Sequence, residues 1–556
     1  MVGASIARSV SRLVLLALVG LAPGCGERRL PYGATTVPPP APLPACSAPG
    51  APDSATLVRD FGNKLRPGYL APLDDCHLLF VLVGTPSGVP WPLWRTDGTL
   101  AGTQEVASDF GVGLGSYHVG GALILSSLWR TDGTGGGTFK LADGLWAYDT
   151  NHVDAALLGD ALLFAASDDR PGQQPAATSH GVELWKTDGS RAGTALAAET
   201  IPGPDPVYAD RGPTAFVRAG DLVFFSESFD LWRTDGTMAG TFKIAPIQRG
   251  TASVVLGSTL FFVGAQPGAA PGSIVFGLWR TDGTEAGTVL LRRLDVPANG
   301  GASFYGPRDN LALATLGSNV LLIASSAPAL NLYNIMAPRL GPPIDALWIS
   351  DGTPAGTRLL LELPQVAETS VPPWPRVLDG VAYFASTSGS DPSQPPCAML
   401  WRTDGTREGT LPLANITSWM GVGTHQIFFA GYTPADGPEL WRTDGTRAGT
   451  RQVLPGHAGP LDGCSTVRLD PDLSQFPSAA TIGDQLLYAR SGSDIYLEPW
   501  VTDGTPEGTR IVPTEPASAA PLSPLEFTRV NDAVYFTALT RDSRDYSLWR
   551  YVPPRP

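Results

Sequence analysis

The chain has 556 residues, of which 43% are hydrophobic and 16% are charged, so it is long enough to bury a large core. Its net charge of −14 argues against a nucleic-acid partner and against direct attraction to an acidic membrane surface, because both recruit basic proteins. The 64 glycines and 53 prolines are spread along the chain, which indicates many turns between short strands rather than disorder.

The first 25 residues are expected to form a targeting segment of the lipoprotein type. Arg8 and Arg12 precede an apolar run, residues 13–22, that is too short to span a bilayer. The sequence Leu-Ala-Pro-Gly-Cys then resembles the bacterial lipobox, and this resemblance implies a lipid on Cys25. An ordinary secretory signal with an incidental cysteine is the alternative. Both predict an exported protein, and lipidation places it in the periplasm, or at the outer membrane or cell surface, with the lipid as its only membrane attachment.

Residues 26–54 are rich in proline, and such a segment stays extended and semi-rigid. We expect it to be a tether between the anchor and a folded body at residues 55–556. Four cysteines remain, and in an oxidising compartment an even number suggests two disulfides with three possible pairings. Proximity in sequence favours Cys46 with Cys76 and Cys397 with Cys464. No Cys/His cluster has zinc spacing, so no metal cofactor is expected.

One motif dominates the folded body. The pattern Trp-x-x-Asp-Gly-(Thr/Ser)-x-x-Gly-Thr occurs nine times in full, and a tenth copy ends as Leu-Trp-Arg-Tyr. The copies lie about 50 residues apart. Their tryptophans are Trp94, Trp129, Trp185, Trp232, Trp279, Trp348, Trp401, Trp441, Trp500 and Trp549.

Each copy is predicted to be a unit of four antiparallel strands. A short apolar run such as residues 222–228 or 427–431 precedes the motif and is typical of a buried strand. The motif itself is expected to be a hairpin with Asp-Gly-Thr at its turn, where Asp caps backbone amides and Gly accepts a positive φ. The turn aspartates are Asp97, Asp132, Asp188, Asp235, Asp282, Asp351, Asp404, Asp444 and Asp503.

A four-stranded sheet repeated at this period suits the blade of a β-propeller. The segment at residues 55–61 resembles the strand that follows the first motif, at residues 102–110, and the last copy lacks its outer strand. We therefore expect an all-β fold: a single closed β-propeller of about ten four-stranded blades, with the N-terminal strand completing the last blade. The interval of 35 residues before Trp129 predicts that one blade is incomplete or merged, so eight or nine blades are also possible.

Three copies carry a further resemblance. ELWKTDGSRAGT (residues 183–194), ELWRTDGTRAGT (439–450) and the variant EPWVTDGTPEGT (498–509) resemble the ELWxxDGT-repeat proteins, also called hyalin-like repeats, of bacterial secreted and surface proteins. The resemblance covers about residues 55–550 and implies an exported repeat protein, but it supplies no activity or catalytic residues. The first two copies depart from it, because Pro92 and Ser127 replace the glutamate.

Side chains with possible functional chemistry are few. The ten motif tryptophans are expected to pack between blades, whereas Trp91, Trp146, Trp374 and Trp419 lie outside the register, in predicted loops, and are candidate ligand contacts. Calcium at the aspartate turns is the alternative to turn capping, but each turn offers one carboxylate and calcium needs six to eight oxygens. Arg or Lys follows eight of the motif tryptophans and is expected either to pair with the aspartates around the ring or to be solvated.

The leading functional hypothesis is a non-enzymatic, membrane-tethered propeller that binds a glycan, an envelope polymer or another protein through loops on one face. It rests on the variable length of the segment between the apolar strand and the motif. A hydrolase or lyase acting on polysaccharide at the central channel is the alternative, and would gather two acids, or an acid and a histidine, at the channel mouth. A purely structural surface protein is the third possibility. No catalytic residue is assigned.

Overall fold

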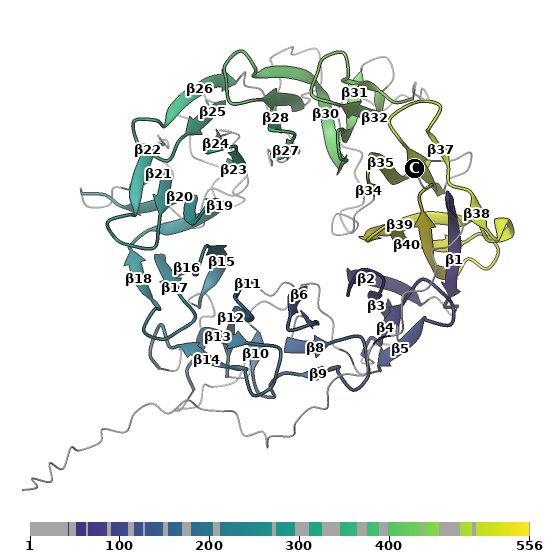
Figure 1. Ribbon diagram of the computed structural model, residues 1–556, viewed down its shortest axis with the longest axis horizontal. Coiled ribbons are helices and arrows are strands. Elements are labelled where there is room, and N and C mark those ends of the chain that lie inside the picture. The colour runs from purple at the N-terminus through teal and green to yellow at the C-terminus, as the bar shows by residue number, and fades with distance from the viewer. Residues whose placement is uncertain are drawn as a thin grey trace, which may run out of the picture.

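The computed structural model is all-β, and its sheets follow one another around a ring (Figure 1). It describes residue 43 and residues 52–62, 65–85, 90–108, 110, 116–125, 128–147, 154–168, 179–203, 212–269, 274–294, 311–324, 345–363, 375–387, 398–433, 437–454, 479–491 and 496–554. Within these ranges, no helix has the length and apolar character needed to cross a membrane.

The units from the first to the fifth copy of the motif are four-stranded, with one additional short strand in the third. They are β2 (Arg66–Pro72), β3 (Leu78–Val83), β4 (Leu93–Thr96) and β5 (Gln104–Ala107); β6 (Ser116–Val119), β7 (Ala122–Leu125), β8 (Trp129–Thr131) and β9 (Phe139–Lys140); β10 (Trp146–Ala147), β11 (Ala155–Leu158), β12 (Ala161–Ser167), β13 (Val182–Thr187) and β14 (Ala195–Ala198); β15 (Thr214–Ala219), β16 (Leu222–Glu227), β17 (Asp230–Thr234) and β18 (Phe242–Ala245); β19 (Gln248–Leu256), β20 (Thr259–Pro267), β21 (Ile274–Thr281) and β22 (Val289–Arg293).

The remaining units complete the ring. They are β23 (Leu311–Leu316), β24 (Asn319–Ala324), β25 (Asp345–Ser350) and β26 (Arg358–Leu363); β27 (Arg376–Leu378), β28 (Val381–Thr387), β29 (Ala398–Thr403), β30 (Leu411–Val422), β31 (Ile427–Thr433), β32 (Gly437–Thr443) and β33 (Arg451–Gln452); β34 (Ala479–Ile482), β35 (Gln485–Ser491), β36 (Leu497–Thr502) and β37 (Arg510–Ile511); β38 (Thr514–Glu515), the 3-10 helix η3 (Ala517–Ala519), β39 (Pro521–Val530), β40 (Ala533–Thr540) and β41 (Tyr546–Val552).

The N-terminal strand β1 (Ser54–Asp60) lies in the last sheet. It pairs antiparallel with β41, so that Leu57 is opposite Trp549, and the short strand β38 runs parallel along its other edge. Arg510 forms an ion pair with Asp53 just before β1. The two ends of the folded body are therefore joined by backbone hydrogen bonds within one sheet (Figure 1).

Two successive units share one sheet, but not at the position that the sequence predicts. The interval of 35 residues before Trp129 gives a separate sheet of four short strands, β6 to β9. The merging occurs instead at β30, whose 12 residues pair with β29 up to Ile416 and with β31 from Ile416 onward. Because one continuous strand is both the last strand of one unit and the first of the next, no connection separates them and a seven-stranded sheet results.

The core is divided among the contacts between successive units. The described residues form ten hydrophobic clusters, each containing one motif tryptophan and each drawn from two neighbouring units. Trp185, for example, packs with Val119 and Ile124 of the preceding unit. Trp94 of the first unit packs with Tyr535 and Leu548 of the last. The tryptophan is thus the residue by which each sheet packs against its predecessor.

The two ends of the sheets differ in their connections. Successive strands are antiparallel, so the hairpin between the first and second strands and the motif turn between the third and fourth lie at one end, the turn end. The connections between the second and third strands, and those leading to the next unit, lie at the opposite end, the loop end. The strands nearest the centre of the ring in Figure 1 are β2, β6, β11, β15, β19, β23, β27, β34 and β39.

Candidate functional site

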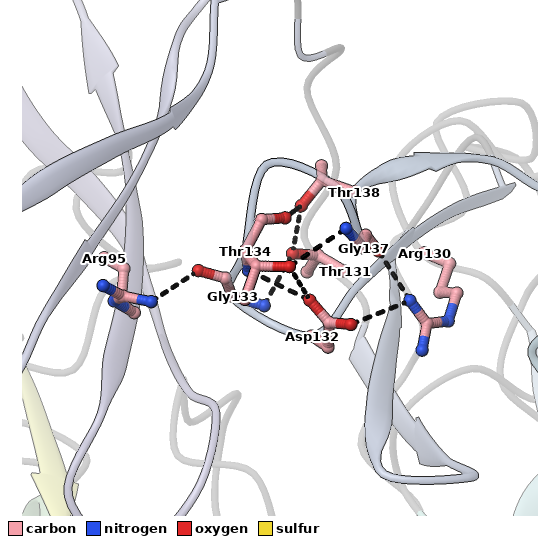
Figure 2. A network of polar contacts seen from close by, with 8 residues as sticks. All are labelled: Arg95, Arg130, Thr131, Asp132, Gly133, Thr134, Gly137 and Thr138. Carbon is pink, nitrogen blue, oxygen red and sulfur yellow. Dashed lines mark hydrogen bonds and ion pairs between the residues drawn. The ribbon is translucent and has the colours of Figure 1, made fainter. Parts of the chain in front are cut away.

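The motif turn is a closed hydrogen-bond network, shown for the second copy in Figure 2. Asp132 Oδ1 accepts hydrogen bonds from the Thr134 amide at 3.0 Å and from its hydroxyl at 2.7 Å. The Thr134 hydroxyl in turn accepts from the Gly137 amide at 3.0 Å. The hydroxyls of Thr131 and Thr138 lie 2.7 Å apart and join the two strands at the base of the turn. The polar side chains of the motif therefore bond mainly to one another and to the backbone of their own turn.

All nine complete copies repeat this geometry. The aspartate Oδ1 lies 2.8–3.0 Å from the amide two residues on and 2.6–2.7 Å from the hydroxyl of the same residue. The hydrogen bond from that hydroxyl lowers the pKa of the carboxyls of Asp235, Asp282 and Asp351. One oxygen of each carboxylate is thus used by its own turn, which fits a capping role better than a calcium ligand.

Two glycines make this turn possible. The glycine after the aspartate has a positive φ, between +81° at Gly133 and +92° at Gly283, where a side chain is strained. A Cβ at the last glycine of each copy would lie only 1.9–2.1 Å from a carboxylate oxygen of the motif aspartate. The motif spacing therefore follows from close packing between the backbone and a capping side chain.

The cation after the tryptophan links neighbouring turns. Arg95 Nη1 donates to the carbonyl of Gly133 in the next unit at 2.8 Å (Figure 2). Arg402 makes the same bond to Gly445 at 3.0 Å. The sequence predicted pairing with the aspartates or solvation, but the contact between units is to a glycine carbonyl. The ion pair with an aspartate seen for Arg130, at 3.2 Å, is within one turn.

Acidic residues connect units at the loop end. In two copies the residue two positions before the motif tryptophan is a glutamate that forms an ion pair. Glu439 pairs with Arg490 at 3.7 Å, and Glu498 pairs with Arg541 at 3.2 Å. Both arginines belong to the following unit. The copies at Trp441 and Trp500 therefore carry a polar link to the following unit at the loop end.

The glutamate at the same position of the third copy, Glu183, lies close to a second buried acid, Glu227. Glu183 and Glu227 are 1% and 2% exposed, and the Thr200 hydroxyl lies 2.7 Å from a carboxylate oxygen of each. Burial raises the pKa of Glu183 to about 7, against the opposing effect of the hydrogen bonds from Thr200. Sequence reasoning did not select these acids, because Glu227 lies in an apolar strand that gives no signal of a neighbouring carboxylate.

The innermost strands carry a second polar group near the loop end. Asp154 accepts hydrogen bonds from the amides of Ala215 and Phe216 in the next unit. Arg249, in β19, is 7% exposed, and burial lowers its pKa to about 10, although Asp154 opposes that shift. Its Nη1 donates to Ser253 Oγ at 3.2 Å, while Nε and Nη2 have no hydrogen-bond partner among the described residues. A carboxylate could accept hydrogen bonds from both of these nitrogens.

The candidate ligand-binding tryptophans do not converge. Trp91 stacks on Tyr69 with ring centroids 5.7 Å apart and is partly buried. Trp146 is 38% exposed in β10, and Trp419 is partly buried in β30, where it contacts Arg376. Both lie in strands rather than in the predicted loops, because each pairs with a neighbouring strand through its backbone. Trp374 lies outside the described residues.

Of the cysteines, Cys76 alone is within the described part of the chain, and it is disulfide-bonded. The other four cysteines, Cys25, Cys46, Cys397 and Cys464, lie outside the described residues, and one of them is its partner. Asp74 and His77 flank Cys76, and the three side chains offer ligand atoms within 4.8 Å of one another. The sulfur is already in a disulfide and Asp74 is hydrogen-bonded to His77 Nδ1 at 2.8 Å, so this group is described as a capped turn.

No protein-family model and no curated protein matches the chain. Among solved structures, a puromycin hydrolase is 15% identical with a TM-score of 0.28, over 70% of this chain and 59% of that one. The β-propeller domain of the Trilobed protease from Pyrococcus furiosus is 10% identical with a TM-score of 0.27, over 65% and 96%. An α-L-arabinanase from Penicillium chrysogenum, complexed with arabinobiose, is 12% identical with a TM-score of 0.22, over 53% and 90%. The chain thus spans less than two thirds of the puromycin hydrolase, and the activities named are those of the matched proteins.

Proposed function

We propose that the folded body is a single closed β-propeller of ten blades. Eight of the sheets contain one motif tryptophan each, and the seven-stranded sheet divides at Ile416 into two further blades. The ten hydrophobic clusters match ten contacts between blades, including the contact of Trp94 with the last blade. Strand β1 then serves as the fourth strand of the blade formed by β39, β40 and β41, with the short strand β38 along its outer edge.

We propose that this propeller is an exported, lipid-anchored scaffold that binds a glycan, an envelope polymer or a protein through its loop end. The contrast between the two ends supports this most directly. At the turn end, all nine complete motif turns share one hydrogen-bond geometry, so their backbones differ little from copy to copy. At the loop end, the connection between the second and third strands ranges from residues 126–128 in one blade to residues 325–344 in another.

The polar group at the inner strands supports binding at the same end. Asp154 and Arg249 lie where β11 and β19 begin at the loop end of the ring. Buried charged groups are normally fully hydrogen-bonded, so the two unused donors of Arg249 call for an acceptor. An acidic group of a bound partner is one such acceptor.

The hydrolase alternative draws less support from the described residues. The carboxyls of Glu183 and Glu526 each have a pKa raised by burial to about 7, which is a property of many general acids. However, Glu526 forms an ion pair with Arg66 of the first blade at 2.8 Å, and Glu183 is bonded to Thr200. Each is 1–2% exposed and already has partners for its oxygens, Glu526 in the first blade and Glu183 in the segment that follows β14.

Two experiments test the proposal. Cell fractionation should find the full chain with the membrane and the Cys25→Ser variant in a soluble envelope fraction. The same distribution for both proteins would contradict the lipid anchor.

The full chain should show saturable binding to a glycan array or to envelope extracts, without degradation of polysaccharide. Replacing residues 325–344 by a Gly/Ser segment of equal length should weaken that binding, whereas Glu285→Gln in a motif turn should not. Turnover of a polysaccharide would instead support the hydrolase.

A further inference from the structure

A groove of about 790 Å³ lies on the outer rim of the ring, between β5 of the first blade and β9 of the second. One wall is the run of residues 105–108, and the other is formed by Phe139 and Lys140. Trp129, which is buried in the core, borders the groove, and Arg191 of the third blade also lines it. The volume is within the range of small-molecule sites, about 300–1,000 Å³.

The groove exists because the second copy of the motif is unusual. Its turn reads Asp-Gly-Thr-Gly-Gly-Gly-Thr, so Gly135 and Gly136 stand where the first copy has Leu100 and Ala101. A Cβ at Gly136 would meet no atom within 4 Å, and a Cβ at Gly135 would touch only the Val106 carbonyl, at 3.4 Å. The outer strand β9 has two residues, whereas β18 and β22 have four and five. β33 and β37 also have two residues, so the missing side chains at Gly135 and Gly136 are what distinguish the rim at this blade.

The lining combines a fixed aromatic surface with balanced charges. Arg130 and Arg191 place their guanidinium carbons 5.3 and 4.8 Å from the centroid of the Phe139 ring, and Arg191 Nε donates to the Lys140 carbonyl at 3.0 Å. These contacts hold Phe139 in place. The groove also contains two carboxylates, Glu105 and Asp143, and its two cations, Lys140 and Arg191, so the formal charges cancel.

This combination selects for one class of ligand. Carboxylates accept hydrogen bonds from hydroxyl groups, and the lysine and arginine donate to hydroxyl oxygens. The apolar face of a sugar ring packs on aromatic side chains, and the partly exposed Phe139 supplies one in this groove. A strongly acidic or basic ligand would meet a like charge beside each opposite one, at a cost that a neutral polyol avoids.

We propose that this rim groove binds a neutral oligosaccharide. The site lies along the outer strands β5 and β9, from Gly135 in the motif turn to Ser108 and Asp143 in the connections to the next units, and it does not include residues 325–344. The inference adds a glycan site to the proposed scaffold function and rests on that function only in the choice of an envelope glycan as ligand.

The test uses the full chain, isothermal titration and tryptophan fluorescence. The probes are the neutral tetramers cellotetraose, maltotetraose and chitotetraose, with tetragalacturonate as the acidic probe and the glucosamine tetramer as the basic probe. We expect saturable binding of at least one neutral tetramer and weaker binding of both charged probes. Gly135→Leu, which restores the residue of the first copy, should fill the groove and weaken binding at least about tenfold.

Glu105→Gln keeps the shape and removes one charged acceptor, so it should weaken binding about tenfold even if Gly135→Leu disturbs folding. Glu507→Gln is the matched control, because Glu507 is exposed in the motif turn of another blade. This variant should bind the neutral tetramer with the same affinity as the original chain. Failure of all three neutral tetramers to bind, or undiminished binding by both groove variants, would overturn the proposal. Loss of loop-end binding on replacement of residues 325–344 is independent of these outcomes, so the two proposals fail separately.

Discussion

A substitution at the last glycine of the motif turn tests why the repeat requires glycine at that position. In Gly137→Ala, the new Cβ would lie 1.9 Å from Asp132 Oδ2, so the carboxylate must move. Asp132 is 6% exposed and would lose its two hydrogen bonds from Thr134. Each bond to a charged group contributes about 1.5 kcal/mol, while the alanine recovers about 0.5–1 kcal/mol of backbone entropy. We expect a net loss of about 2 kcal/mol in the free energy of unfolding.

The neighbouring glycine is the control. Gly136→Ala changes the same turn by the same methyl group, but its Cβ would meet nothing within 4 Å, so it should leave stability unchanged or raise it by up to about 1 kcal/mol. Equilibrium urea denaturation followed by tryptophan fluorescence measures both. In an Asp132→Ala background the clash is removed, and Gly137→Ala should then cost nothing further. Equal losses for the two glycines, or additive losses in the double variant, would refute this account of the turn.

Three further outcomes are expected. Trp549→Ala, at a side chain with no exposed surface, should destabilise the fold by about 3–5 kcal/mol in the same urea assay, and a loss below about 1 kcal/mol would contradict its place in the core. Because the pKa of Glu183 is raised from 4.5 to about 7, its protonated form stabilises the fold below pH 4.5, and on the order of 3 kcal/mol is lost as pH rises from 4.5 to 7. Urea midpoints at pH 5 and pH 8 should therefore differ less for Glu183→Gln. Arg95→Met should cost about 1–2 kcal/mol by leaving the Gly133 carbonyl without its bond between blades, whereas Arg218→Met, at an exposed hydrogen bond within one hairpin, should change the midpoint little.

The sequence supported the features that each copy determines by itself. The alternation in Leu-Trp-Arg-Thr predicts a strand with tryptophan on a buried face, and Asp-Gly-Thr predicts its turn. The pairing of β1 with β41 was also predictable, because residues 55–61 resemble a strand that otherwise follows a motif. Each of these predictions depends on a short stretch of sequence, and the repetition of that stretch makes the prediction possible.

Features that depend on two copies at once were not predictable. The shared strand β30 arises because Thr417 and Ser418 continue the strand across the boundary between units, and a spacing of 40 residues does not distinguish that from a short turn. The groove was not predicted, because the three consecutive glycines of the second copy form it only together with β5 and Arg191, which lie in other blades. The unused donors of Arg249 likewise depend on where β19 meets its neighbours.

The direction in which the tryptophan packs explains the closure of the ring that we propose. Every motif tryptophan contacts the preceding unit, so a linear array would leave the first one, Trp94, without a partner. In the ring its partners are Tyr535 and Leu548 of the last unit, and Arg59 of β1 places its guanidinium carbon 4.8 Å from the Trp94 ring. The N-terminal strand therefore contributes twice: its backbone pairs with β41, and its side chain contacts the first blade. Removing β1 would expose both the edge of the last sheet and the face of the first, and for this reason we expect a chain that begins after residue 60 to lose closure as a unit rather than to fray at one blade.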